Sequence, residues 1–230
     1  MMDFFTQSVF FGVCLSLACY EAGAFLKRKL GYAFLNPLLI SIVLSIGVLL
    51  VTHIDYDVYY SGAKYLSYLL TPATICLAIP LYEQFEILKK NVQAVIAGIV
   101  SGILTSVGTI LLCAVLFHFE HAEYVTFLPK SITTAIGMGV SEQLGGYPSI
   151  TAAVIIITGV LGNILAEPVC KIFRITDPVA KGIGIGSASH AIGTSKAMEM
   201  GEVEGAMSGL SIAVAGIITV FAAILFAGFY

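Results

Sequence analysis

Long runs without a charged side chain constrain the fold of this chain more than any other feature. Four such runs reach the length of about 20 residues that a helix needs to cross the hydrocarbon of a bilayer, at residues 30–54, 91–117, 143–166 and 205–230. Two shorter runs lie at residues 4–20 and 65–82. The sequence therefore predicts an all-α polytopic membrane protein with at least six spans.

The composition excludes several other classes of protein. Hydrophobic residues make up 58% of the 230 positions and charged residues only 11%, against about 25% in soluble domains. The net charge is -3 and no basic cluster is longer than residues 27–29, which disfavours a nucleic-acid partner. The first residues, MMDFFTQ, contain no basic group, so the first apolar run is predicted to be a retained span and not a signal peptide.

Basic residues predict the orientation in the membrane. They occur at residues 27–29, at 89–90 and between 171 and 181, and the positive-inside rule places all three groups in the cytoplasm. This is satisfied if the N-terminus lies outside and segment 127–146 dips into the membrane and returns to the same face. In the alternative, segment 127–146 crosses fully and the third group lies outside.

Segment 182–199, GIGIGSASHAIGTSKAME, belongs to an internal repeat. Its A-I-G triplet recurs at residue 135, and a related A-I-P triplet starts at residue 78, so that the triplets begin 57 and 56 residues apart. Ser or Thr precedes each triplet, and an acidic residue followed by a long apolar run comes after it. Because its charge-free part is short and its glycine-rich start disfavours a helix, this segment is predicted to be interrupted or re-entrant.

These repeats predict an architecture. Residues 1–62 are expected to form N-terminal scaffold helices, followed by three repeat-like units at 63–126, 127–181 and 182–230, the last two with broken segments at 127–146 and 182–199. The whole would have six to eight membrane helices, and the second and third units would be inverted relative to each other. In carriers with such repeats, broken segments meet near the bilayer midplane and line the substrate site. We therefore expect an elevator-like carrier.

Small, hydroxyl-bearing and basic residues of the three repeated segments are the candidates for substrate binding. Lys196 would hold a carboxylate, with an ion pair to Glu199 as the alternative. His190 would bind substrate or be a buried structural histidine. The hydroxyls would bind substrate or bond their own helix, and the glycines would admit a ligand or another helix. The predicted substrate-binding residues are Thr71, Thr74, Ser131, Thr133, Thr134, Gly137, Ser187, Ser189, His190, Gly193, Thr194 and Lys196.

Enzymatic functions fit the sequence poorly. GIGIGS lacks the third glycine of a dinucleotide-binding motif, and GTSK lacks the Gly-Lys pair of a P-loop. A Ser-Lys hydrolase would place a serine three or four residues before Lys196, where Gly193 and Ile192 stand. No Cys-x-x-Cys pair indicates a metal site. We predict no enzyme, no cofactor and no metal, while proton or sodium coupling stays open.

Three blocks of the sequence, LLTPATICLAIPLYEQFEILKKN, LPKSITTAIGMGVSEQLGG and GIGSASHAIGTSKAMEMGEVEGAMSGL, resemble the LrgB/CidB family. The resemblance implies a multi-pass protein of the bacterial inner membrane that acts with a small holin-like partner of the LrgA/CidA type. It also implies one of two roles: antiholin-like control of murein hydrolases, or transport of small carboxylates such as pyruvate, or glycolate with glycerate in plastid relatives.

Two hypotheses of different classes follow. The first is a secondary transporter, or a transporter subunit, for a small monocarboxylate such as pyruvate, glycolate or lactate, acting with an LrgA/CidA-type partner. The alternative is an antiholin-like regulator of murein hydrolase export, autolysis and programmed cell death, without a substrate of its own. Homo-oligomers are compatible with both. A wide pore is disfavoured, because residues 97–113 and 209–225 carry only scattered Ser and Thr.

Overall fold

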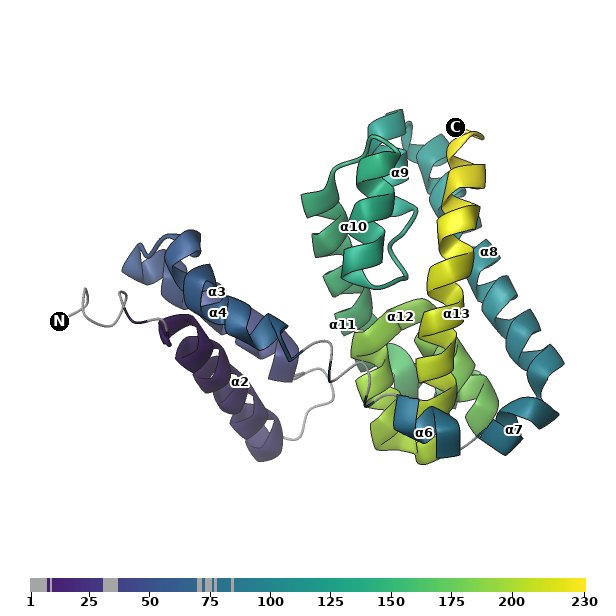
Figure 1. Cartoon of the computed structure of the whole chain (residues 1–230), viewed down its shortest axis with the longest axis horizontal. Coiled ribbons are helices and arrows are strands. Elements are labelled where there is room, and N and C mark those ends of the chain that lie inside the picture. Colours follow the sequence, from purple (N-terminus) through teal and green to yellow (C-terminus); the bar gives the residue numbers. More distant parts are fainter. Residues whose placement is uncertain are drawn as a thin grey trace. The chain divides into compact units, whose positions relative to one another are not determined.

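The computed structural model describes residues 8, 10–30, 37–69, 72, 76, 78–83 and 85–230 (Figure 1). Every regular element among these residues is an α-helix, which confirms the predicted all-α fold. The chain forms two compact units, Met1–Cys76 and Leu77–Tyr230. The division into four units at residues 62, 126 and 181 stays a prediction.

The first unit packs its helices through close backbone contacts. Its elements are α2 (Phe11–Leu30), α3 (Pro37–Thr52) and α4 (Tyr56–Ser67). A Cβ on Gly12 would collide with the α4 backbone at Tyr59 and Ala63, and one on Gly23 would lie 2.6 Å from the Pro37 carbonyl oxygen. The Ser16 hydroxyl lies 2.7 Å from that of Tyr59. Helix α2 continues to Leu30 and so carries the basic residues 27–29 in its last turn.

The second unit is built around three long helices. Its elements are α6 (Ala78–Glu83), α7 (Phe85–Lys90), α8 (Val92–Phe117), α9 (His121–Phe127), α10 (Thr134–Gln143), α11 (Pro148–Ile172), α12 (Pro178–Met200) and α13 (Glu202–Ala227). Helices α8, α11 and α13 have 26, 25 and 26 residues and are apolar enough to cross a membrane. Each is about 38 Å long, more than the roughly 30 Å of bilayer hydrocarbon.

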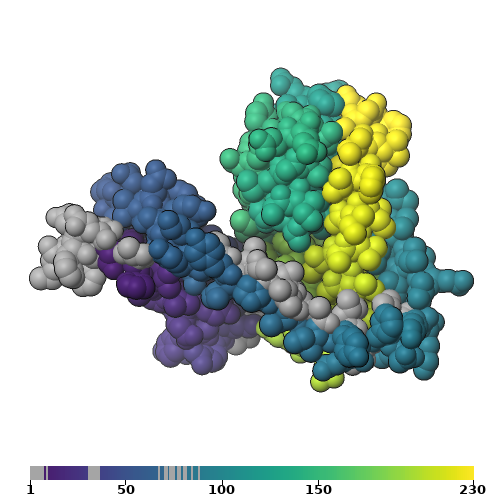
Figure 2. Space-filling view, in the orientation of Figure 1, coloured from purple at the N-terminus to yellow at the C-terminus, as the bar shows by residue number. Residues whose placement is uncertain are grey.

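Apolar side chains cover both the inner and the outer faces of these helices. On α8 the buried positions follow helical spacing, at residues 95, 99, 103, 107, 110 and 114. The opposite face is also mostly apolar, and Leu116 and Phe117 at its end are 64% and 70% exposed. Figure 2 shows the upper part of α13 at the surface between α10 and α8. An apolar outer face needs lipid around it, so the second unit is a membrane-embedded helical bundle.

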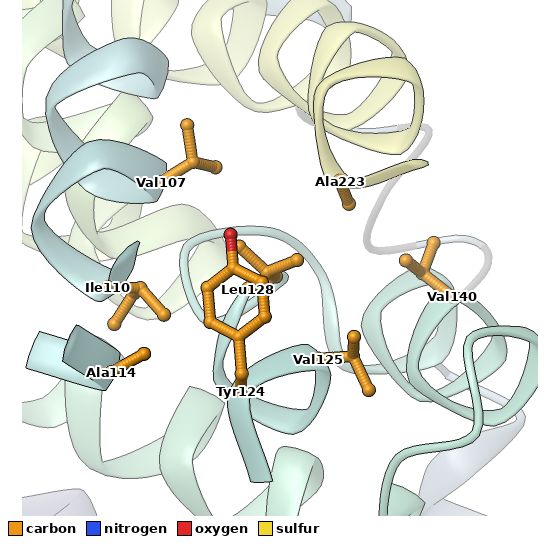
Figure 3. Packing of buried hydrophobic residues seen from close by; sticks show 8 residues of the cluster. All are labelled: Val107, Ile110, Ala114, Tyr124, Val125, Leu128, Val140 and Ala223. Atoms are coloured by element: carbon orange, nitrogen blue, oxygen red, sulfur yellow. The ribbon is translucent and has the colours of Figure 1, made fainter. Parts of the chain in front are cut away.

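Two apolar clusters lie toward opposite ends of this bundle. In the first, α9 and α10 pack against the C-terminal halves of α8 and α13, around the fully buried Tyr124 (Figure 3). The Tyr124 hydroxyl donates to the Phe226 carbonyl oxygen at 2.9 Å. In the second, Ile183 of α12 packs against the N-terminal halves of α8 and α13. Helices α9 and α10 therefore belong to one end of the bundle and α12 to the other (Figure 1).

The glycine-rich start of α12 is helical, where the sequence predicted an interruption. Asp177 caps this helix, since its carboxylate accepts from the Ala180 N–H at 2.8 Å, and Pro178 occupies the first helical position. Gly182 and Gly186 face α13, where a Cβ on either would collide with the backbone of Glu204 or Ser208. The glycines therefore allow close helix packing, which offsets their poor helix propensity.

Candidate functional site

Helix α12 folds back on itself at His190. The backbone of His190 has φ 41° and ψ -144°, which is not helical. Ile185 and Ala197 pack in one cluster, whereas twelve residues of straight helix would separate them by about 18 Å. Gly182 lies against Glu204, and Met198 lies against Gly205. Both ends of α12 therefore meet the same end of α13, and residues 178–200 form a helical hairpin with its tip at His190.

The tip holds a strained and buried residue. His190 is 3% exposed, and its positive φ is rare for a residue other than glycine, at a cost of order 1–3 kcal/mol. Its ring Nε2 lies 2.9 Å from the Ile155 carbonyl oxygen of α11 and donates to it, because a carbonyl can only accept. Asn163 of α11 donates to the Ile192 carbonyl oxygen just after the tip. Bonds to α11 thus stabilise the reversal.

A second hairpin forms at the opposite end of the bundle, from residues 121–146. The Thr126 hydroxyl accepts from the Tyr147 N–H at 2.8 Å, and the Thr126 carbonyl oxygen accepts from the Thr151 hydroxyl at 3.0 Å. Thr126, near the end of α9, is therefore level with the start of α11. The chain between them descends through turns at residues 128–131 and returns as α10. Its tip comprises residues 130–133.

Both hairpins contact the middle of α8 close to their tips. The Ser131 hydroxyl lies 3.1 Å from that of Ser106. One turn away, the Ser187 hydroxyl lies 3.0 Å from the position of a Cβ on Gly102. Ile155 of α11 contacts both hairpins, since its side chain meets Gly137 and its carbonyl accepts from His190. Segments about 55 residues apart in sequence thus converge near the middle of the bundle.

Charge and hydroxyl groups cluster at residues 130–133, the tip of the hairpin formed by residues 121–146. The Lys130 ammonium donates to the Ser131 hydroxyl at 3.1 Å, and Ser131 also shares a hydrogen bond with Ser106. Thr133 is the N-cap of α10, with extended backbone angles and no capping bond from its side chain. Thr134 is the first helical residue, so the N-terminus of α10 lies at this tip.

The hydroxyls of α12 are already engaged within the protein. Ser187 donates to the Ile183 carbonyl oxygen at 2.7 Å, and the Thr194 hydroxyl lies 2.7 Å from that of Ser208 on α13. Ser189 is 3% exposed and packs against Gly162 of α11. Protein atoms also fill the space beside the two predicted glycines: Gly137 faces Ile155 and the Pro129 carbonyl, and Gly193 faces Ser189 and Ile185.

Lys196 forms ion pairs with two carboxylates. Its ammonium lies 2.7 Å from Glu167 of α11 and 3.1 Å from Glu199, one turn along α12. The ion pair with Glu199 was the alternative left open by the sequence, and Glu167 adds a link between helices. Glu167 also pairs with Lys171 at 3.5 Å. The Lys196 side chain is 19% exposed and that of Glu167 40%, so this cluster joins the returning half of α12 to α11 at the edge of the bundle.

Some predicted residues cannot be placed, and some residues of the site were not predicted. Thr71 and Thr74 lie outside the described residues. Lys130 directly precedes Ser131 in the repeated segment, and this position was the available signal for it. Ser106 and Ser208 gave no signal, because single serines in apolar helices usually bond their own backbone.

An apolar groove runs between α11 and the first half of α12. Its volume is about 210 Å³, and it extends from Lys181 near the end of the bundle to Ser189 near the tip. Gly162, Ala166, Cys170 and Ile185 contribute to its walls. An almost entirely apolar lining is unsuited to hold a carboxylate, so this groove is not the anion site.

Three long apolar helices with two internal hairpins define a polytopic α-helical membrane protein. The model of the LrgB-like family matches residues 16–229, and this chain belongs to that family. It is 38% identical over 216 residues to the antiholin-like protein LrgB of Bacillus mycoides (strain KBAB4), covering 94% of both chains. The LrgB proteins of Bacillus cereus (strain B4264) and Bacillus anthracis (strain CDC 684 / NRRL 3495) give the same values. No solved structure matches the chain.

Proposed function

We propose that this protein is a secondary transporter, or a transporter subunit, for a small monocarboxylate in a bacterial inner membrane. The observation that carries the proposal is the convergence of two hairpin tips on Ser106 and Gly102 of α8. Each tip is followed by a helix that starts there, α10 at Thr134 and the second half of α12 after His190. Two helix N-termini near the middle of a membrane-embedded bundle favour an anionic ligand.

The hairpins also support a carrier mechanism. They belong to opposite ends of the bundle, as broken segments of inverted repeats do in carriers that expose a central site alternately to each side. We propose that segments 127–146 and 182–199 are such re-entrant repeats and that they move elevator-like against a scaffold. Pyruvate, glycolate and lactate are the proposed substrates, and proton or sodium coupling remains open. The proposed partners are an LrgA/CidA-type protein and further copies of this chain.

Individual residues take the following roles in the proposal. Ser131, Thr133, Thr134 and the start of α10 bind the carboxylate. His190 donates Nε2–H to the Ile155 carbonyl oxygen, so Nδ1 of the neutral ring accepts from the hydroxyl of the substrate, and a bond to a keto oxygen requires the protonated ring. For Lys196 to bind the carboxylate, as the sequence predicts, its ammonium must exchange Glu167 or Glu199 for the substrate. Ser187, Ser189 and Thr194 shape the tip of the α12 hairpin.

Uptake into proteoliposomes tests the proposed function. We expect saturable uptake of labelled pyruvate, glycolate or lactate when the protein is reconstituted with its LrgA/CidA-type partner. Uptake saturates because each protein offers a limited number of anion-binding sites, which we propose lie at the hairpin tips. Liposomes with the partner alone are the control, and proton and sodium gradients are varied. If no saturable uptake occurs under any gradient with both proteins present, the protein is not a carrier of these acids.

Cysteine labelling tests the proposed topology. Tyr147 and Thr176 flank α11, which is long enough to span the membrane. In a background without the native cysteines, we expect an impermeant maleimide to label Tyr147→Cys from outside and Thr176→Cys from the cytoplasm only. Together with an N-terminus outside, this result would place hairpin 121–146 at the outer face of the membrane and hairpin 178–200 at the cytoplasmic face, as proposed. Labelling of both positions from the same side would refute the orientation.

A regulatory function is the second candidate. The names of the similar Bacillus proteins describe them as antiholin-like. Close packing of Gly182 and Gly186 of α12 against α13 is also compatible with a rigid bundle that organises a partner. In this case the protein would alter murein hydrolase release and bind no carboxylate. Substrate-independent control of autolysis, together with a lack of uptake, would favour this function.

A further inference from the structure

Lys130 differs from Lys171, Lys181 and Lys196 in its surroundings. Lys171, Lys181 and Lys196 each lie within 4 Å of a carboxylate. Lys130 is partly buried, and no ion pair to it occurs among the described residues. Its ammonium instead donates to the Ser131 hydroxyl at 3.1 Å. A partly buried cation without a counterion is unfavourable, and a bound anion would compensate it.

The surroundings of Lys130 provide the remaining groups of an anion site. Ser131 is 7% exposed, and its hydroxyl lies 3.1 Å from that of Ser106. A carboxylate displacing the bond between Lys130 and Ser131 would accept from an ammonium and from one or both hydroxyls, which are strong charge-assisted hydrogen bonds. Cys113 stands seven residues, about two turns, beyond Ser106 on the same face of α8.

We propose that Lys130, Ser131 and Ser106 form the anion-recognising cluster of the protein and select singly charged carboxylates. The proposal rests on the transport function proposed above and names the group that recognises its substrate. One cation neutralises one negative charge, so a second carboxylate would remain unpaired in a poorly solvated place. The cluster therefore discriminates against dicarboxylates of similar size.

Two measurements on the purified protein test this cluster. The first is binding of glycolate, lactate, pyruvate and malonate by calorimetry. The second is the rate of Cys113 alkylation in a variant that keeps only this cysteine. We expect at least one of the three monocarboxylates to bind and to slow alkylation, and malonate to do neither. Lys130→Gln should weaken binding about tenfold or more and abolish the protection, while Lys130→Arg retains part of both.

Lys89→Gln is the matched control, because Lys89 is an exposed lysine on α7 that pairs with Glu86. It should bind as the wild type does. If Lys130→Gln fails to give a cooperative thermal transition, Ser106→Ala takes its place, with an expected weakening of at least threefold. Unchanged binding in the folded variants, malonate binding equal to that of the monocarboxylates, or no binding to the wild type would each overturn the proposal.

Failure of the proposed anion-recognising cluster can be distinguished from failure of the proposed transport function. Wild-type protein that binds a monocarboxylate through Lys130 but does not move it across the membrane would refute the carrier and leave the cluster intact. Saturable uptake that is the same in Lys130→Gln as in the wild type would refute the cluster and leave the carrier intact.

Discussion

Replacing Gly186 by valine lowers the midpoint of thermal unfolding by about 5 °C or more and abolishes function. A Cβ at this position would collide with the Ser208 carbonyl oxygen and lie 2.8 Å from the Ser208 Cα. Backbone atoms cannot rotate away as a side chain can, so α12 must move away from α13. Such overpacking costs about 1 to 3 kcal/mol in folding free energy.

Gly184→Val provides the matched control within the same helix. Gly184 is exposed, and a Cβ there has no atom within 4 Å. Removing this glycine reduces the conformational entropy of the unfolded chain, so we expect an unchanged or slightly higher midpoint. The midpoints of both variants are measured from the loss of the helical circular dichroism signal on heating in detergent. Equal midpoints for the two would show that the contact between α12 and α13 is not as close as described.

Reversing the charge of Lys196 is the second large perturbation. In Lys196→Glu, three carboxylates gather where Lys196 now pairs with Glu167 and Glu199. Repulsion replaces two attractive contacts, one of which joins α12 to α11. We expect a loss of at least about 1 kcal/mol in folding free energy and no uptake in proteoliposomes.

The double variant Lys196→Glu with Glu167→Lys separates the two roles of Lys196. It restores the link between helices with reversed polarity, although the new lysine lies near Lys171. Because both carboxylates already engage the ammonium, we expect the swap to recover most of the stability and part of the uptake. Recovery of stability without any uptake would instead show that Lys196 itself binds the substrate.

The sequence predicted three of the long membrane helices, because their signal is local, whereas the number of six spans stays a prediction. Charge-free runs around residues 91–117, 143–166 and 205–230 correspond to α8, α11 and α13. Each signal depends only on consecutive apolar side chains, which lipid requires whatever the tertiary structure. The boundaries were less accurate: α11 continues past Glu167 to Ile172, since polar groups at the end of a span can reach the interface.

The site was less predictable, because its contacts join distant segments. Residue type marked Ser131 and His190 as candidates, but the partner of His190 is a backbone carbonyl of Ile155, which no side-chain pattern can indicate. The link between Lys196 and Glu167 depends on the reversal of α12 at His190, and helix propensity would place a break at the preceding glycines. Packing against α13 decides that these glycines remain helical.

The contacts of α8 with both hairpins require a fixed number of residues between positions 102 and 106. Gly102 meets one tip and Ser106 meets the other, and four residues of α-helix advance about 6 Å while turning only about 40° past a full turn. Both contacts therefore lie on nearly the same side of one rod. Inserting or deleting a single residue between them would swing one contact by about 100° away from the other. Substitutions can be tolerated between positions 102 and 106, but a change in the number of residues there would separate the two halves of the site.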